Sequence, residues 1–278
     1  MPDDKATVQV QSPIVVDITS LTRQFGDLTA VDAVSLTVLR GEIFGLIGPN
    51  GAGKSTLIRM LTTLLPPTSG TAKIADFDIV AEPADVRRRI GYVPQLLSAD
   101  GSLTGYENML LSARLYGVPR GERNERIARA LARMGLTEAA DHVVGHYSGG
   151  MIRRLEIAQS LLHRPLVLFL DEPTVGLDPA ARDTVWEHVV DLRDRFNRTM
   201  IVTSHHMDEI EAFCDRVALI DHGQIVAVGT SAELKARVGP GASLDDVFVK
   251  LVAPTSETES GGSYASVRRD RRAVRDHG

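Results

Sequence analysis

The chain has 278 residues, 43% of them hydrophobic, which is enough for one large domain or two small ones with an ample core. Its net charge of −5 and its sequence pI near 5.9 argue against a protein that binds nucleic acid, because such proteins normally carry a basic stripe on one face. The single cysteine, Cys214, excludes an internal disulfide, and its apolar helical context indicates packing.

The N-terminal part of the chain predicts an antiparallel edge sheet. Residues 1–12 are polar, and we expect them to be loosely ordered. They lack the apolar core of a signal peptide, and no run in the chain approaches the ~18 apolar residues of a membrane span, so we expect the chain to stay in the cytosol. Residues 13–19 and 31–38 are rich in β-branched side chains, and Gly26-Asp27 between them favours a turn.

A strand, a glycine-rich loop and a helix follow. Residues 42–47 read as a short buried strand, and residues 54–65 have leucine-type side chains at helical spacing before two prolines end the pattern. The loop between them fits G-x-x-x-x-G-K-S in the context that a phosphate-binding loop requires. Its candidate nucleotide-binding residues are Gly48, Pro49, Asn50, Gly51, Ala52, Gly53, Lys54, Ser55 and Thr56.

The loop has a specific chemistry. Its glycines let backbone N–H groups converge on phosphate oxygens, and the helix N-terminus adds partial positive charge. Lys54 would reach the β- and γ-phosphates, and the Ser55 hydroxyl would ligate Mg²⁺. The alternative is a glycine-rich turn without a ligand.

The middle and the C-terminal part predict a helical insertion in a parallel sheet. Residues 90–94 read as a strand, and a helical insertion with no strand candidate follows at about residues 98–163. Residues 166–170 and 199–203 are strands, each followed by a helical segment, which is the βαβ rhythm of a parallel sheet. A hairpin around His222-Gly223 comes next.

Composition sets the domain boundaries. After Leu251 the chain is rich in Thr, Ser, Glu and Gly and then in Arg, so we expect residues 252–278 to be a disordered basic tail. Residues 13–251 contain no internal repeat and predict one nucleotide-binding domain. The fold class is therefore α/β, with a parallel sheet core, an N-terminal antiparallel β subdomain and an inserted helical subdomain.

Two carboxylates end the strand at residues 166–170. Asp171 and Glu172 would lie at the carboxyl edge of the sheet, where open α/β folds bind ligands. One acid can hold Mg²⁺ while the other orients and deprotonates an attacking water. A helix N-cap followed by a solvated acid is the alternative interpretation. His205 directly follows another strand and belongs to the same edge, unless it is an ordinary surface or core histidine, as we expect of His206.

Ser148-Gly149-Gly150 predicts a second anion site. Ser148 is a good helix N-cap, and the two glycines would let backbone N–H groups approach a phosphate at a helix start. An N-cap without a ligand is the simpler alternative. Gln95 alone, after Pro94, would be a plain turn residue.

The ordered set of these motifs resembles the ATPase subunit of an ABC transporter, whose core is a P-loop (RecA-like) fold, over residues 13 to about 251. The resemblance implies ATP and Mg²⁺ as ligands and a dimer with a second copy or a paralogue. It implies that the signature, Ser148–Met151, contacts the γ-phosphate of the opposite protomer, and that Asp178 communicates across the dimer. It gives catalytic roles to Lys54, Glu172 and His205, and Mg²⁺ contacts to Ser55, Gln95 and Asp171.

Phe25 is similar to the aromatic residue on which family members stack adenine, although phenylalanine is often a core residue. Tyr147 and Met151 depart from the commonest signature, Leu-Ser-Gly-Gly-Gln. Together with residues 153–158, 220–225 and 244–248, these departures resemble the drug-resistance exporters of the daunorubicin type.

The resemblance implies a peripheral subunit on the cytoplasmic side of the membrane. Its partner would be an integral-membrane permease supplied by another chain, and it would bind no nucleic acid. Nodulation-type exporters, lipid or polysaccharide exporters and importers remain alternatives. A soluble ATPase of DNA maintenance is a further one, although only about ninety-five residues separate Gly53 from Ser148, with no heptad array or CxxC motif between them.

Overall fold

The structure is a computed structural model that describes residues 14–256. The predictions for residues 1–12 lie outside the described part, as do those for the tail from residue 257 onward. The last helix, α9 (Leu244–Ser256), continues into the segment predicted as a tail. None of the described helices is long and apolar enough to cross a membrane.

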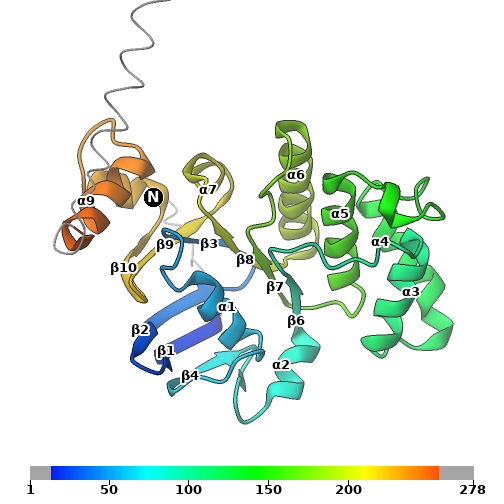
Figure 1. Cartoon of the computed structure of the whole chain (residues 1–278), viewed down its shortest axis with the longest axis horizontal. Coiled ribbons are helices and arrows are strands. Elements are labelled where there is room, and N and C mark those ends of the chain that lie inside the picture. Colours follow the sequence, from blue (N-terminus) through cyan, green and yellow to red (C-terminus); the bar gives the residue numbers. More distant parts are fainter. Residues whose placement is uncertain (1–13, 257–278) are drawn as a thin grey trace, which may run out of the picture.

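A six-stranded sheet forms the centre of the described molecule, with strand order β10-β9-β3-β8-β7-β6 (Figure 1). Five strands are parallel, and β10 pairs antiparallel with β9 at one edge. All residues of β3, β7 and β8 are buried, which explains their continuous apolar runs. The strands are β3 (Ile43–Ile47), β6 (Ile90–Val93), β7 (Val167–Asp171), β8 (Thr199–Ser204), β9 (Arg216–Asp221) and β10 (Gln224–Gly229).

A second, antiparallel sheet has the order β2-β1-β4-β5. Its hairpin turns at Gly26, as predicted, but both strands are longer than the sequence indicated, because their outer residues face solvent and break the alternation. Two strands were not predicted. The sheet comprises β1 (Ile14–Phe25), β2 (Leu28–Leu39), β4 (Ser69–Ile74) and β5 (Phe77–Asp78).

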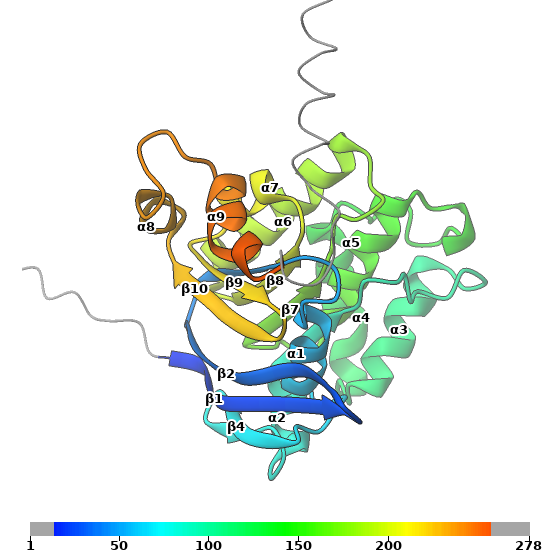
Figure 2. The ribbon, with the colours of Figure 1, turned by 60° about the vertical axis from the view of Figure 1, so that its left-hand side comes forward.

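Helices separate and cover the sheets. Helix α1 lies between the two sheets, and α3, α4 and α5 form the predicted insertion at one side (Figures 1 and 2). Helix α1 ends at Leu61 and not at residue 65, because Thr63 has a φ of 62°, outside the helical region. The helices are α1 (Lys54–Leu61), α2 (Pro83–Arg89), α3 (Gly105–Leu115), α4 (Arg123–Arg133), α5 (Gly149–Ser160), α6 (Pro179–Phe196), α7 (Met207–Phe213) and α8 (Ser231–Ala236).

The period-two alternation of the strands divides the core between the two faces of the parallel sheet. Phe169 packs with α1 and the antiparallel sheet, whereas its neighbours Leu168 and Leu170 pack with the insertion and α6. A third cluster joins β9 to α7, α8 and α9. Both faces are therefore fixed, and only the strand ends remain available for polar chemistry.

Candidate nucleotide-binding and catalytic site

The glycine-rich loop connects β3 to α1 and is built so that only glycine fits at its ends. A Cβ at Gly48 would lie 2.2 Å from the carbonyl oxygen of Ile220. Gly53 has a φ of 103°, and a Cβ there would lie 2.4 Å from the carbonyl oxygen of Ala30. Helix α1 begins without a side-chain cap, so its first N–H groups remain available to an anion.

Lys54 lies over this loop with only 5% of its surface exposed. Its Nζ donates to the carbonyl oxygens of Gly48 at 2.7 Å and Pro49 at 3.0 Å, and lies 3.9 Å from Glu172 Oε1. Burial lowers the pKa of Lys54, and the carboxylates of Glu172 and Asp171 act in the opposite direction. A phosphate would offer this ammonium stronger, charge-assisted hydrogen bonds than the neutral carbonyls do.

Asp171 ends β7 and is held by two hydroxyl groups. Its Oδ1 accepts from Thr203 Oγ1 at 2.7 Å and from Ser55 Oγ at 3.3 Å. The structure thus brings together two of the three predicted metal ligands. Helix α6 begins only at Pro179, with Asp178 as its N-cap, so the interpretation of the acidic pair as a helix cap is wrong.

Glu172 is the point where four segments meet. Its Oε2 accepts from Gln95 Nε2 at 3.1 Å and lies 3.3 Å from His205 Nδ1, while Oε1 faces Lys54. Its backbone is in the left-handed region, with a φ of 47°, and its N–H donates to Thr203 Oγ1 at 2.8 Å. The structure therefore brings Lys54, Gln95 and His205 together around the carboxylate of Glu172.

Thr203 is a site residue that sequence reasoning missed. Its hydroxyl bridges the two acids, donating to the Asp171 carboxylate and accepting from the Glu172 backbone. Its signal in the sequence is weak, because threonine is common in strands. Its place at the end of a buried strand, two residues before His205, is the clue that was available.

The signature turn is formed as predicted but stands apart from this cluster. Ser148 caps α5, and its Oγ accepts from the backbone N–H of Met151 at 3.2 Å. Gly149 and Gly150 pack closely against Leu177 and Ala181, at the start of α6. In the described part of the chain, no hydrogen bond links this turn to the loop at residues 48–55.

Phe25 ends β1 beside the hairpin turn and is 44% exposed, so the interpretation as a core residue is wrong. The guanidinium of Arg23 lies 4.6 Å from the centre of its ring. An exposed aromatic ring with a cation on it can stack a planar base.

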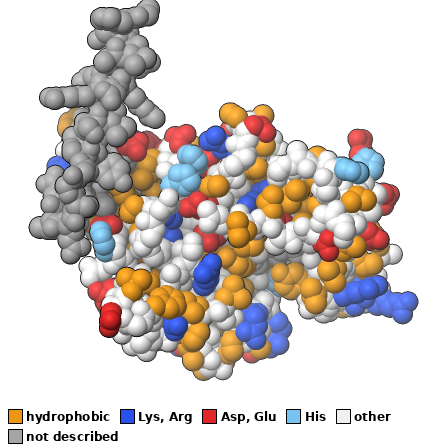
Figure 3. Space-filling model, viewed as in Figure 1, with side chains coloured by type: hydrophobic (Ala, Val, Ile, Leu, Met, Phe, Trp, Pro, Cys, Tyr) orange, Lys and Arg blue, Asp and Glu red, His pale blue; other side chains and the backbone are white. Residues whose placement is uncertain are grey.

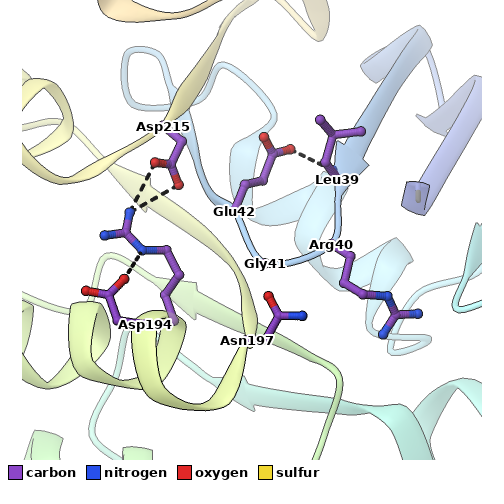
Figure 4. A pocket seen from close by; sticks show the side chains of 8 residues that line it. Leu39, Arg40, Gly41, Glu42, Asp194, Asn197 and Asp215 are labelled. Carbon is purple, nitrogen blue, oxygen red and sulfur yellow. Dashed lines mark hydrogen bonds and ion pairs between the residues drawn. The ribbon is translucent and has the colours of Figure 1, made fainter. Parts of the chain in front are cut away.

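A polar pocket of about 510 Å³ lies at the opposite end of the sheet (Figure 4). Its lining residues Glu42 and Asp215 directly precede β3 and β9, so the pocket opens at the amino ends of parallel strands. Its charges pair with one another, since Arg193 contacts Asp194 and, at 3.1 Å, Asp215. Burial raises the pKa of Glu42, which accepts from the Leu39 N–H. We assign no catalytic part to this pocket.

The family model for ABC transporters matches residues 31–175. The chain belongs to the ATP-binding subunits of this family. It is 44% identical to the daunorubicin/doxorubicin resistance ATP-binding protein of Streptomyces peucetius, over 84% of this chain and 70% of that protein. It is 41% identical to the linearmycin resistance ATP-binding protein of Bacillus subtilis, over 79% of this chain and 70% of that one.

Solved structures agree with the family. An ATP-binding subunit of an ABC transporter superposes with a TM-score of 0.76 and 29% identity, covering 85% of this chain and 99% of that one. A dimeric ATP-binding cassette in a post-hydrolysis state, bound to ADP and Pi, gives 0.69 and 25% identity, covering 77% and 98%. The predicted fold class, family and ATP-hydrolysing activity of this ABC ATPase are thereby confirmed, and the DNA-maintenance alternative is not supported.

Proposed function

We propose that this ABC ATPase powers efflux of an antibiotic or another hydrophobic compound through a separate permease. Two relatives are named for resistance to daunorubicin, doxorubicin or linearmycin. The Nod factor export ATP-binding protein I of Sinorhizobium fredii is also 39% identical, over 81% of this chain and 66% of that protein. The convergence of Lys54, Gln95 and His205 on Glu172 is the observation that carries the catalytic part of this proposal.

The residues present fit Mg²⁺ and a triphosphate. Mg²⁺ prefers oxygen ligands and is usually held by one or two carboxylates, waters and substrate phosphates. Ser55 and Asp171 offer such oxygens 3.3 Å apart beside the loop, and Gln95 lies at the same edge through Glu172. When bound, Mg²⁺ would neutralise charge that develops on the phosphate oxygens.

The side chains divide the chemistry among them. Glu172 accepts the proton of the attacking water and holds that water in line with the terminal phosphate. Lys54 and the N–H groups of the loop hold the phosphate oxygens. His205, beside Glu172 and 45% exposed, is placed to donate a hydrogen bond to the same phosphate.

A dimer would complete the site. The Ser148 hydroxyl accepts from Met151 and keeps its own proton to donate, and the adjacent glycines leave backbone N–H groups approachable. In a head-to-tail pair, this turn would meet the γ-phosphate held by Lys54 of the other copy. The solved relative bound to ADP and Pi is dimeric, which supports pairing of two copies.

A groove of about 560 Å³ supports docking of the permease. Arginines of α2 and α4 line it together with the apolar end of α3, and Figure 3 shows hydrophobic and basic side chains gathered over this lower part of the molecule. Leu115 is 78% exposed there. A cytoplasmic loop of the permease with apolar and acidic side chains would fit this surface.

Transport into inside-out vesicles tests the proposal. Vesicles that hold this ATPase and its permease should accumulate daunorubicin when MgATP is added, and the Glu172→Gln variant should abolish the accumulation. Accumulation at the normal rate by that variant would contradict the assigned chemistry. ATP hydrolysis without accumulation of daunorubicin would exclude that drug as the cargo, and the same result with doxorubicin and linearmycin would contradict export of this class of drug.

A further inference from the structure

Arg153 is among the largest fully buried side chains of the described molecule, with 1% of its surface exposed. It lies on α5, in the same helix that begins at the signature turn. Its Nη1 donates to the carbonyl oxygen of Pro94 at 2.6 Å, and its Nη2 donates to that of Gln95 at 2.7 Å. One guanidinium therefore holds two successive carbonyls of the segment that carries Gln95.

Glu156, one turn later on α5, holds the far side of the same segment. Its Oε1 accepts from the backbone N–H and, at 3.0 Å, from the hydroxyl of Ser98. Its Oε2 accepts from Arg153 Nη1 at 3.0 Å, so the two buried charges also pair with each other. The pair thus fixes residues 94–98 from both ends.

The fixed segment reaches the catalytic carboxylate. Gln95 is held through its backbone carbonyl by Arg153, and its side chain donates to Glu172 Oε2. A buried ion pair is weak evidence for stability, because desolvation of both charges offsets their attraction. Four hydrogen bonds from the pair to one short segment do fix its geometry, and that segment positions Gln95.

We propose that Arg153 and Glu156 are positioning residues that link the signature helix to the catalytic carboxylate through residues 94–98. A displacement of α5 at the signature turn would then move Gln95 relative to Glu172, so that hydrolysis depends on the arrangement of both. This inference rests on the proposed function, because it takes Glu172 as the base and Gln95 as its neighbour.

Steady-state hydrolysis of MgATP by the full chain separates positioning from packing. Arg153→Met should lower kcat about tenfold with the KM for ATP within about twofold, because the loop that holds the phosphates is untouched. Arg153→Lys, which keeps the charge but loses the planar fork that holds the two carbonyls, should lower kcat about threefold. The matched control is Arg198→Met, whose Nη1 donates to the Pro165 carbonyl oxygen, also at 2.6 Å, and it should leave both constants within about twofold.

A double-mutant cycle gives the decisive result. If Arg153 acts through Gln95, Arg153→Lys should have little further effect in the Gln95→Ala background, whereas independent effects multiply. Multiplying effects would overturn the proposal, as would normal kcat in a folded Arg153→Met protein. The cycle uses the conservative variant, so it remains informative if the methionine variant fails to fold.

Amide hydrogen exchange provides a readout that needs no catalysis. The Ser98 amide, which donates to Glu156, should exchange faster in Glu156→Leu and in Arg153→Lys than in the unmodified chain, and unchanged exchange would contradict the contact. Failure of the proposed function can be told apart from failure of this inference, because it would appear as normal ATP hydrolysis in the Glu172→Gln variant. The exchange result would then still decide whether the pair holds residues 94–98.

Discussion

The phosphate-binding loop and the signature turn both contain glycines and both begin a helix, yet only the first lies beside a cluster of charged side chains. Helix α1 begins without a side-chain cap, and its first residue, Lys54, belongs to the cluster around Glu172. Helix α5 begins with Ser148 as a cap, and its first two glycines lie against the apolar side chains of Leu177 and Ala181. Under the proposed function, the first start has the groups that would act on a phosphate, and the second offers only a place to bind one. Under the same proposal, these two starts belong to a completed half of the site, which one chain builds, and to an incomplete half, which needs a second copy.

Replacing Glu172, the proposed base of the completed half, should have the largest effect on ATP hydrolysis. Glu172→Gln should lower the rate of ATP hydrolysis by at least about 100-fold while ATP still binds, because the amide cannot accept the proton. Phosphate release measures the first quantity, and equilibrium binding of a fluorescent ATP analogue measures the second. Glu187→Gln, an exposed glutamate on α6, is the matched control and should change neither.

Removing the ammonium group of Lys54 should lower the affinity for ATP. Lys54→Ala takes away charge-assisted contacts to the β- and γ-phosphates, each contributing about 1.5–3 kcal/mol, so the dissociation constant should rise more than about tenfold. Lys73→Ala, on the exposed surface of β4, removes the same charge away from the site and should leave the affinity unchanged. Equal affinities for the two variants would contradict the role of Lys54.

The sequence predicted most of the completed half, because its residues follow buried strands. Continuous apolar runs located β3, β7 and β8, and the carboxyl ends of parallel strands lie at one edge. Strand β4 was missed because only Ala72 and Ile74 are buried in it, so its pattern is weak. Contacts made through the backbone were also missed. The hydroxyl bridge of Thr203 and the carbonyl contacts of Arg153 depend on the placement of distant segments, which no local pattern records.

The exposed aromatic residue at the end of β1, Phe25, should give a smaller effect on ATP binding. Phe25→Ala should weaken ATP binding by roughly 1 kcal/mol, the lower end of the stacking range, because the ring is partly exposed and lies against Arg23 on one face. Phe25→Tyr should retain the affinity. Leu28→Ala, which removes an exposed apolar side chain on the other side of the hairpin turn, serves as the control. A loss of affinity in Leu28→Ala that matched the loss in Phe25→Ala would indicate damage to the hairpin.

Two N-caps of the helical insertion allow a matched test of the incomplete half. Ser148 caps α5, and Thr104 caps α3 with a full capping box. Replacement by alanine should lower the free energy of unfolding by about 1 kcal/mol at either position, because each side chain satisfies one N–H of the first turn. Chemical denaturation measures this cost.

The two variants should differ when nucleotide is added. Each should be made in the Glu172→Gln background, where closed dimers should accumulate with ATP, and sizing chromatography should show several-fold fewer dimers for Ser148→Ala than for Thr104→Ala. The physical reason is that the Ser148 hydroxyl has a proton left to donate after it accepts from Met151, and a phosphate of the opposite copy is the acceptor we assign to it. If both variants formed dimers equally, Ser148 would act only as a helix cap. That result would contradict the assignment of the signature turn to the phosphate of the opposite copy.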